Sequence, residues 1–428
     1  MKLRLSQRWV KYIPVVLIAL AIGLSPSFSI GEISTGRALE IRLEDLLIVV
    51  LGIVWIAGLL RLRKTRLERP PLLIPILVWL GIGFFSLLTN WLFQNLIFQR
   101  SFFFFLKEVE FFAFYFYVFY HIKNIDVVRI LIKTWILIGV IHASWILFQV
   151  ITGLRITYYY GSTLFIEPEG TFPGGGFLLI LFAFLLQFLL YYYVRMNLSV
   201  WQKIAIAAAV VMPTVGIFSS GSRTAFFGFL FALVITFFLY LAKQSNFRKA
   251  VLQSVWVLLI IGIAFGFLVM TSPTVERRLL QLEGITKEFN PQNPNVRGDT
   301  WKTQLTGAFE RPLFLLFGFG KSIIFTFGES HNQYVRNFIE TGIVGSLIFL
   351  MLIFVVISKA WKEFLKGTDP LILALSAGVL VITSTMLFMS IVVDAFIVVK
   401  IAELYWFFIA LSMTTFYLTK KKINSYHE

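Results

Sequence analysis

The chain has 428 residues and a net charge of +16, with 58% hydrophobic and only 14% charged residues. Together with a mean hydropathy of +0.83, this composition excludes an ordinary soluble domain and indicates an all-α polytopic membrane protein. Cysteine is absent, which excludes disulfides, thiolate metal sites and a cysteine nucleophile.

Twelve hydrophobic segments are long enough, at about 20 residues each, to cross the bilayer core as helices. The first follows a basic N-terminus, and we expect it to be retained as a signal anchor. The whole chain, residues 1–428, is therefore predicted to form one integral membrane domain. The segments lie near residues 12–30, 45–60, 71–89, 102–120, 129–152, 175–194, 202–220, 224–242, 250–270, 336–357, 370–392 and 395–418.

Lysine and arginine gather in alternate connections, the pattern of a protein whose basic loops face the cytoplasm. This pattern predicts both termini inside and one large external loop, residues 271–335, with short helices between the ninth and tenth spans. Orientation and anionic headgroups explain the positive charge, so we expect the lipid bilayer and no nucleic acid as a partner. The basic residues are Lys2, Arg4, Arg8, Lys11, Arg61, Arg63, Lys64, Arg66, Arg69, Lys243, Arg248, Lys249, Lys359, Lys362, Lys366 and Lys420 to Lys422.

Two pairs of opposite charges fall within predicted spans. Lys107 and Glu110 are three residues apart, and Lys400 and Glu403 repeat that spacing. Each pair lies on one helical face, where we expect a structural ion pair, with a polar cavity as the alternative.

The sequence gives little support for a metal site or a nucleotide-binding site. The four histidines, at positions 121, 142, 331 and 427, show no metal-ligand spacing, so we expect no metal and no cofactor. Gly320, Lys321 and Ser322 imitate the end of a phosphate-binding loop, but Leu315 stands where that motif requires glycine.

The connection from Gly153 to Gly176 is the second longest external segment. It contains Arg155, and Pro173 is followed by three glycines, so it is predicted to be irregular. Two interpretations stay open: a re-entrant lining of a cavity and a solvated connector.

The candidate site residues lie at the external mouth and in the long loop. Arg223 follows Ser220, Gly221 and Ser222, and the alternative for it is an arginine reaching the headgroups. In the loop, Arg297 opens an amphipathic segment that Arg311 ends, and Gly318, Phe319 and Gly320 form a turn. His331 and Asn332 then lead into the tenth span, which contains Glu340; for His331 the alternative is a packed or interfacial histidine.

These residue types suit transfer from a diphosphate. Arginine clamps phosphate oxygens with two parallel hydrogen bonds and keeps its charge, so fixed guanidinium groups can neutralise a diphosphate leaving group without a metal. A histidine can remove the proton from an acceptor hydroxyl, a contribution of about 10²- to 10⁴-fold.

The chain resembles the O-antigen ligase and O-antigen polymerase superfamily of bacterial membrane glycan transferases. The resemblance rests on the elements Ser222 to Ala225, Arg297 to Trp301, Gly318 to Gly320 and His331 to Gly342, in that order. The loop Gly170 to Pro173 is also similar, although Gly174 replaces the asparagine that commonly follows the proline.

The resemblance implies an inner-membrane enzyme that transfers a glycan from undecaprenyl diphosphate to an acceptor sugar on the periplasmic face. By analogy, Arg223 and Arg297 hold the diphosphate and His331 is the catalytic base. Arg155, Arg311, Asn332 and Glu340 are possible secondary residues. The acceptor is a glycan or lipid-linked glycan, and direct transfer implies inversion. A polymerase of the same superfamily and a transporter of an anionic solute are the alternatives.

Overall fold

The computed structural model describes residues 12–24, 27–34, 37–62, 68–94, 98–152, 172–196, 199–220, 222–243, 296–321, 323 and 330–424. The ninth predicted span, 250–270, lies outside these residues, as does the first part of the long loop.

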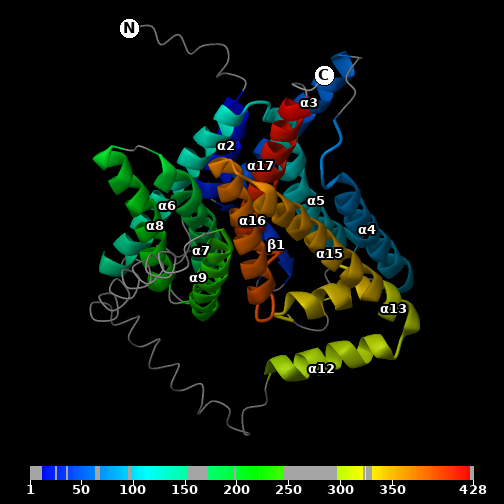
Figure 1. Ribbon diagram of the computed structural model, residues 1–428. Coiled ribbons are helices and arrows are strands. Elements are labelled where there is room, and N and C mark those ends of the chain that lie inside the picture. Colours follow the sequence, from blue (N-terminus) through cyan, green and yellow to red (C-terminus); the bar gives the residue numbers. More distant parts are fainter. Residues whose placement is uncertain are drawn as a thin grey trace.

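Every other predicted span overlaps a helix of one bundle (Figure 1). Helix α7 continues through a π-helical turn η1 (Phe188–Tyr192) and a 3₁₀ turn η2 (Tyr193–Arg195), and two short helices, α12 (Val296–Phe309) and α13 (Pro312–Phe317), precede the tenth span. The span helices are α2 (Ile13–Leu24), α3 (Leu43–Leu62), α4 (Leu73–Gln94), α5 (Phe98–His121), α6 (Ile125–Thr152), α7 (Phe172–Gln187), α8 (Val200–Ser219), α9 (Arg223–Lys243), α15 (Gln333–Lys366), α16 (Pro370–Met389) and α17 (Val399–Asn424).

Eight of the described helices have the length and apolar composition needed to cross a membrane: α4, α6, α7 with η1, α8, α9, α15, α16 and α17. Helix α2 is shorter, at 12 residues, and α5 carries Lys107, Glu108 and Glu110 in its sequence. An all-α polytopic membrane protein is therefore confirmed, while the number of twelve spans stays a prediction.

The first connection contains a β-hairpin that the sequence analysis did not predict. Strand β1 (Ser27–Ser34) pairs antiparallel with β2 (Arg37–Arg42), and Ser27 lies opposite Arg42. The first helix therefore ends at Leu24 rather than near residue 30. Proline at position 26 explains the early end, because it disfavours helix at the residue before it and has no N–H for a helical hydrogen bond.

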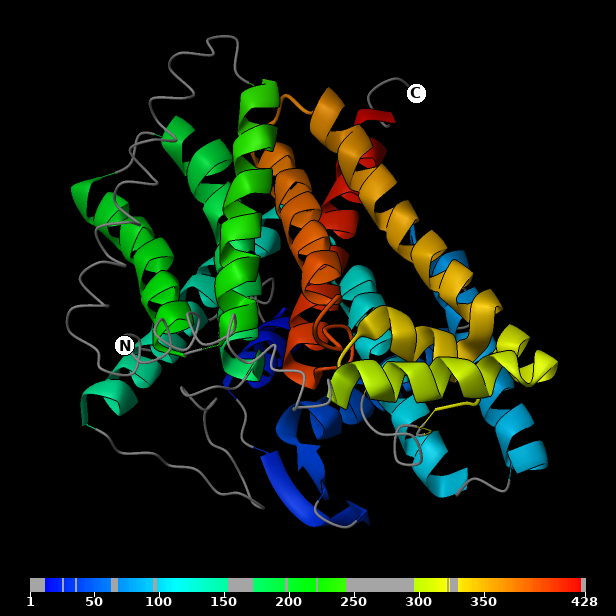
Figure 2. The same cartoon turned by 90° about the horizontal axis from the view of Figure 1, so that it is seen from below.

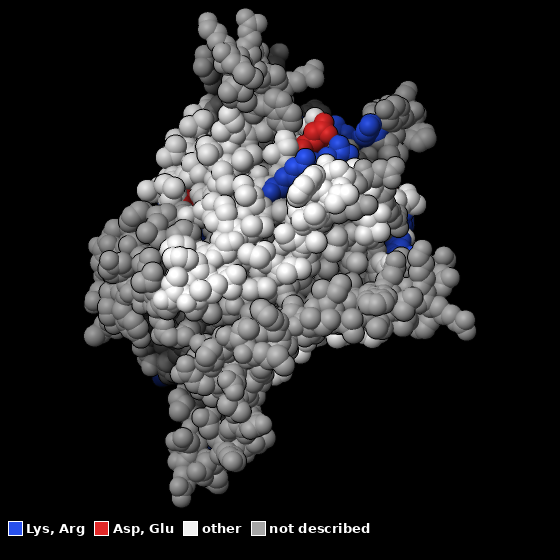
Figure 3. Space-filling model, turned by 90° about the vertical axis from the view of Figure 1, so that its left-hand side faces the viewer, with Lys and Arg blue, Asp and Glu red and all other residues white. Residues whose placement is uncertain are grey.

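Helices α7, α16 and α17 form the centre of the bundle, with 89%, 83% and 89% of their spans buried. Small residues allow their neighbours to approach closely: a Cβ at Gly216 of α8 would lie 2.4 Å from Leu178, and one at Gly378 of α16 would lie 2.7 Å from Phe184. The face of the molecule seen in Figure 3 is almost without charge across its described middle part, and charged atoms gather at its upper edge. This distribution is that of a surface that faces lipid.

The helices alternate in direction, so their ends define two faces. The C-terminal face holds the ends of α15 and α17, where Lys420 and Lys421 pair with Glu363 and Glu68 at 2.5 Å each. The α12 face holds the hairpin, α12, α13 and the first turns of α9, α15 and α17 (Figure 2). The predicted cytoplasmic lysines of α15 and α17 thus lie together, and the candidate site residues within the described part of the chain lie at the opposite face.

Helix α15 is broken at Gly342, which has a φ of 69° and a ψ of −169°. The break lets the carbonyl groups of Ile339 and Glu340 accept hydrogen bonds from the backbone N–H groups of Phe319 (2.7 Å) and Gly320 (3.0 Å). The predicted turn at 318–320 is therefore held in place by backbone hydrogen bonds to the first half of α15. Its close approach requires glycine, since a Cβ at Gly342 would lie 2.2 Å from the carbonyl oxygen of Leu316.

Replacing Gly342 with alanine is expected to lower the free energy of unfolding by about 2–3 kcal/mol, because the backbone conformation is almost restricted to glycine and the methyl group has no room. Thermal unfolding of the purified protein in detergent checks this. Gly81→Ala in α4 is the control, since no atom lies within 4 Å of its added Cβ; equal melting temperatures for the two variants would contradict the role of the break.

Candidate functional site

His331 stands at the entrance to α15 on the α12 face. It is exposed and has a φ of 46°, the only positive φ at a non-glycine position in the described chain. Histidine enters this left-handed region more readily than most residues, yet such conformations are uncommon and concentrate at functional sites. The backbone therefore holds His331 in a specific, outward position.

Asn332 fixes the turn that carries His331. Its side-chain oxygen caps α15 by accepting from the N–H groups of Tyr334 (2.9 Å) and Val335 (3.1 Å), and its amide nitrogen donates to the carbonyl of Ile391 (2.8 Å). N-caps of this kind contribute roughly 1 kcal/mol. Asn332 is therefore a positioning residue beside His331.

The next residue, Gln333, ties the same turn to the connection between α16 and α17. Its N–H donates to the carbonyl of Ser390 at 2.9 Å, and its side-chain oxygen accepts from the N–H of Phe396 at 3.0 Å. The connection contributes Asp394, whose carboxylate accepts from Arg336 at 3.1 Å.

Helix α12 is attached to the residue before His331. The indole N–H of Trp301 donates to the carbonyl of Ser330 at 2.6 Å, and the Ser330 hydroxyl donates to Gln304 at 3.0 Å. Arg297 precedes Trp301 by about one helical turn. Two of the predicted elements, Arg297 to Trp301 and the His331 element, are thus neighbours in space.

A chain of buried charges lies directly behind this turn. Lys321 contacts Glu108 at 2.6 Å and Glu340 at 3.0 Å, Glu340 contacts Arg336 at 2.8 Å, and Arg336 contacts Asp394. The Lys321 ammonium also lies 5.4 Å from the centroid of the Trp79 ring. The network joins α5, α15 and the two connections that flank the His331 turn.

The charges of the two network members outside the spans depend on their neighbours. Burial by itself lowers the pKa of Lys321, but Glu108 and then Glu340 outweigh it and raise that pKa above the ordinary lysine value. Burial raises the pKa of Asp394, opposed mainly by the positive charge of Arg336. Lys321 is therefore a cation throughout the neutral range.

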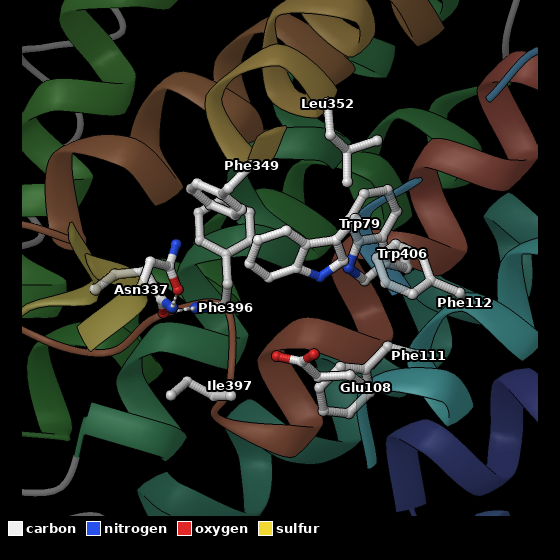
Figure 4. A pocket seen from close by; sticks show the side chains of 11 residues that line it. Trp79, Glu108, Phe111, Phe112, Asn337, Phe349, Leu352, Phe396, Ile397 and Trp406 are labelled. Carbon is white, nitrogen blue, oxygen red and sulfur yellow. Dashed lines mark hydrogen bonds between the residues drawn. The ribbon is translucent and has the colours of Figure 1, made fainter. Parts of the chain in front are cut away.

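A small cavity adjoins the network and is lined mainly by aromatic rings, including Trp79, Trp406 and Phe396 (Figure 4). Oε2 of Glu108 and Nδ2 of Asn337 are buried without a hydrogen-bond partner among the described residues. The cavity measures about 20 Å³, which is room for about one water. It is too small for a sugar and belongs to the support of the site.

The exposed side of α12 borders an open groove of about 590 Å³. Arg311 lies here, where it precedes α13, and it is nearly three turns beyond Trp301. Arg311 is therefore separate from the His331 turn. The groove is lined by Lys302, Thr303, Thr306, Gly307, Glu310, Arg311 and Phe319.

Arg223 is the exposed first residue of α9. The segment around it packs closely on the start of α7, since a Cβ at Gly175 would lie 2.4 Å from the Ser220 hydroxyl and 2.8 Å from Ala225. Further along its length, α9 contacts the end of α16, where the rings of Phe231 and Phe388 stack with their centroids 4.4 Å apart. Arg223 thus lies on the same face as His331, with the end of α16 between their helices.

Two predicted residues have no side-chain description. Arg155 lies outside the described residues, and Arg297 is placed only through its backbone in α12. Their predicted roles stay predictions.

Four charged residues of the network were not predicted from the sequence: Lys321, Arg336, Asp394 and Glu108. Lys321 was considered only as part of a nucleotide motif, and its pairing with Glu108 spans 213 residues. Glu340, expected only as a secondary residue, lies at the centre of the network between Lys321 and Arg336. One signal was available: Glu340 and Arg336 are four residues apart, a spacing that favours an ion pair on a helix.

Of the two predicted intramembrane pairs, one forms. Lys107 contacts Glu110 at 2.9 Å and also Asp45 at 2.7 Å. Lys400 instead contacts Glu44 of α3 at 2.6 Å, so its predicted pairing with Glu403 was wrong. Spacing on one helix could not reveal a carboxylate supplied by another helix.

Lys321→Met is expected to lower the free energy of unfolding by about 3–5 kcal/mol, because it leaves two buried carboxylates without their shared counter-charge. Since the pKa of Lys321 is raised, its contribution is present at neutral pH and is lost only as pH rises above the ordinary lysine range. Thermal unfolding at pH 7 checks the loss. The matched control is Lys302→Met in the exposed groove; a similar small effect of both variants would argue against the network.

Comparison with protein families gives one match. Residues 208–350 match the family model described as O-antigen ligase. No curated protein gives a significant match. The matched segment contains Arg223, Arg297, Arg311, His331, Asn332 and Glu340. This match confirms the predicted resemblance to the O-antigen ligase and polymerase superfamily of membrane glycan transferases.

Proposed function

We propose that the protein transfers a glycan from undecaprenyl diphosphate to an acceptor sugar at the α12 face, as an O-antigen ligase-like enzyme. The observation that supports this most is that the matched segment, 208–350, contains every candidate residue except Arg155. The family match supports glycan transfer from a lipid-linked donor, and the roles of the individual residues are our proposal.

In the proposed reaction, Arg223 and Arg297 bind the diphosphate of the donor. His331 takes the proton of the acceptor hydroxyl, whose oxygen forms a bond to the sugar carbon as the bond to the diphosphate oxygen breaks. The arginines neutralise the charge of the departing diphosphate. Asn332 and the α12 contact at Ser330 hold His331 in place, and no step requires a metal.

The α12 face is proposed to face the periplasm. The lysines of α15 and α17 gather at the opposite face, as the positive-inside rule expects of a cytoplasmic surface. The part of the long loop that contains α12 and α13 would then cover the donor site, and its groove with Arg311 offers hydroxyl and charged groups to an acceptor sugar.

Two alternatives are kept. A polymerase would use the same donor chemistry and a lipid-linked acceptor. A transporter of an anionic solute would bind its substrate at mid-membrane. The buried Lys321 network lies near the α12 face and is internally paired, which favours transfer over transport.

Purified protein in detergent, given undecaprenyl diphosphate-linked oligosaccharide and candidate acceptors, is expected to form a glycosylated product. His331→Ala should slow transfer by about 10²- to 10⁴-fold through loss of the base, and Arg223→Ala by about 10²- to 10³-fold through loss of charge stabilisation. Product formation is followed by mass spectrometry.

Arg129→Ala is the matched control, because Arg129 is half exposed and pairs with Asp126 on α6 near the C-terminal face. Unchanged transfer in the His331 and Arg223 variants would reject the mechanism. Absence of transfer to any acceptor, combined with solute uptake into proteoliposomes, would favour the transporter.

Direct transfer predicts inversion at the sugar carbon, since a single displacement inverts its configuration. Nuclear magnetic resonance of the product linkage measures the anomeric configuration. A product that keeps the configuration of the donor would indicate a two-step reaction and contradict direct attack.

A further inference from the structure

A second buried cluster of charges lies where the β-hairpin meets the bundle. Glu44 and Asp45 occupy the first turn of α3, and Glu403 lies near the start of α17. One carboxylate oxygen from each of the three lies within 4.8 Å of the others. Glu44 and Glu403 are fully buried.

The neighbouring lysines satisfy only part of this cluster. Lys400 contacts Glu44 at 2.6 Å, and Lys107 lies between Asp45 at 2.7 Å and Glu110 at 2.9 Å. Asp45 and Glu110 also share a hydrogen bond with each other, whereas both oxygens of Glu403 are buried without a hydrogen-bond partner among the described residues. Glu403 is therefore aimed into the cluster without a described donor.

The cluster has more acid than base. Its four carboxylates, from Glu44, Asp45, Glu110 and Glu403, meet three cations: Lys107, Lys400 and Arg42, which interacts electrostatically with Glu44 and Glu403. His142 lies nearby but is bonded through its ring to the carbonyl of Gly23. Two carboxyl groups share a hydrogen bond only through a proton, so the bond between Asp45 and Glu110 removes one of the four negative charges. Glu403 remains buried without a described donor, which is costly for a carboxylate unless a cation meets it.

We propose that Glu44, Asp45 and Glu403 bind a hard metal cation through their carboxylate oxygens. Oxygens within 4.8 Å of one another can surround a calcium-sized ion, whose bonds are about 2.3–2.6 Å long. The Asp45 side chain is 15% exposed and offers the ion a way in from the α12 face. The ion joins the end of the hairpin and α3 to α17, and it takes no part in the proposed glycan transfer.

Thermal unfolding of the full-length protein in detergent tests this. The protein is first exchanged into chelator and choline chloride, and sodium, calcium and magnesium chloride are then titrated separately at constant ionic strength. At least one ion should raise the melting temperature by roughly 3–6 °C in a saturable manner. Glu403→Gln should weaken the apparent affinity for that ion at least about tenfold. Glu310→Gln, at the exposed residue that follows α12, should leave the rise in melting temperature unchanged.

The titration of the wild type needs no variant, so the test holds even if Glu403→Gln fails to fold. Absence of a shift with all three ions would overturn the proposal. So would a melting temperature that depends on pH and not on any metal, because a proton on Glu403 would then take the place of the ion. An equal shift in wild type and Glu403→Gln would place the ion elsewhere.

Discussion

The arrangement of the candidate site depends on one buried cation, Lys321, held between Glu108 and Glu340. Lys321 can reach this position only because the preceding segment is bonded to the carbonyl groups of Ile339 and Glu340. Those groups are available because α15 breaks at Gly342. Backbone conformation and charge are therefore coupled, since neither the broken helix nor the buried lysine is favourable without the other.

Because of this coupling, the described part of the long loop is packed into the protein. The part from α13 to Lys321 packs with Ile339 in a small apolar core with Ala308, Phe319 and Ile323, and its lysine is an internal member of the bundle. Helix α12 is joined to the same structure by Trp301 at Ser330. The described half of the loop thus forms a fixed support for the His331 turn, and an opening movement would have to break buried contacts.

The sequence predicted the features that are local. Span positions follow from runs of apolar residues, and the pair of Lys107 with Glu110 follows from their spacing on one helix. The hairpin was missed because the apolar run was extended beyond Pro26. Lys321, Glu108 and Asp394 were missed because their pairing depends on how distant helices pack, and Lys400 paired with Glu44, 356 residues away. The order of the motifs along the chain identified the His331 element. The buried charges that support it could be found only from the structure.

Helix α5 connects the two buried charge clusters. Lys107 and Glu108 are consecutive, and a helix turns by about 100° per residue, so their side chains leave α5 in different directions. Lys107 enters the cluster of Asp45 and Glu110, whereas Glu108 enters the network of Lys321 and Glu340. A rotation of α5 that improved one set of contacts would disturb the other. The two clusters therefore fix the same helix from two sides, and the hairpin end of the bundle and the His331 support are mechanically one unit.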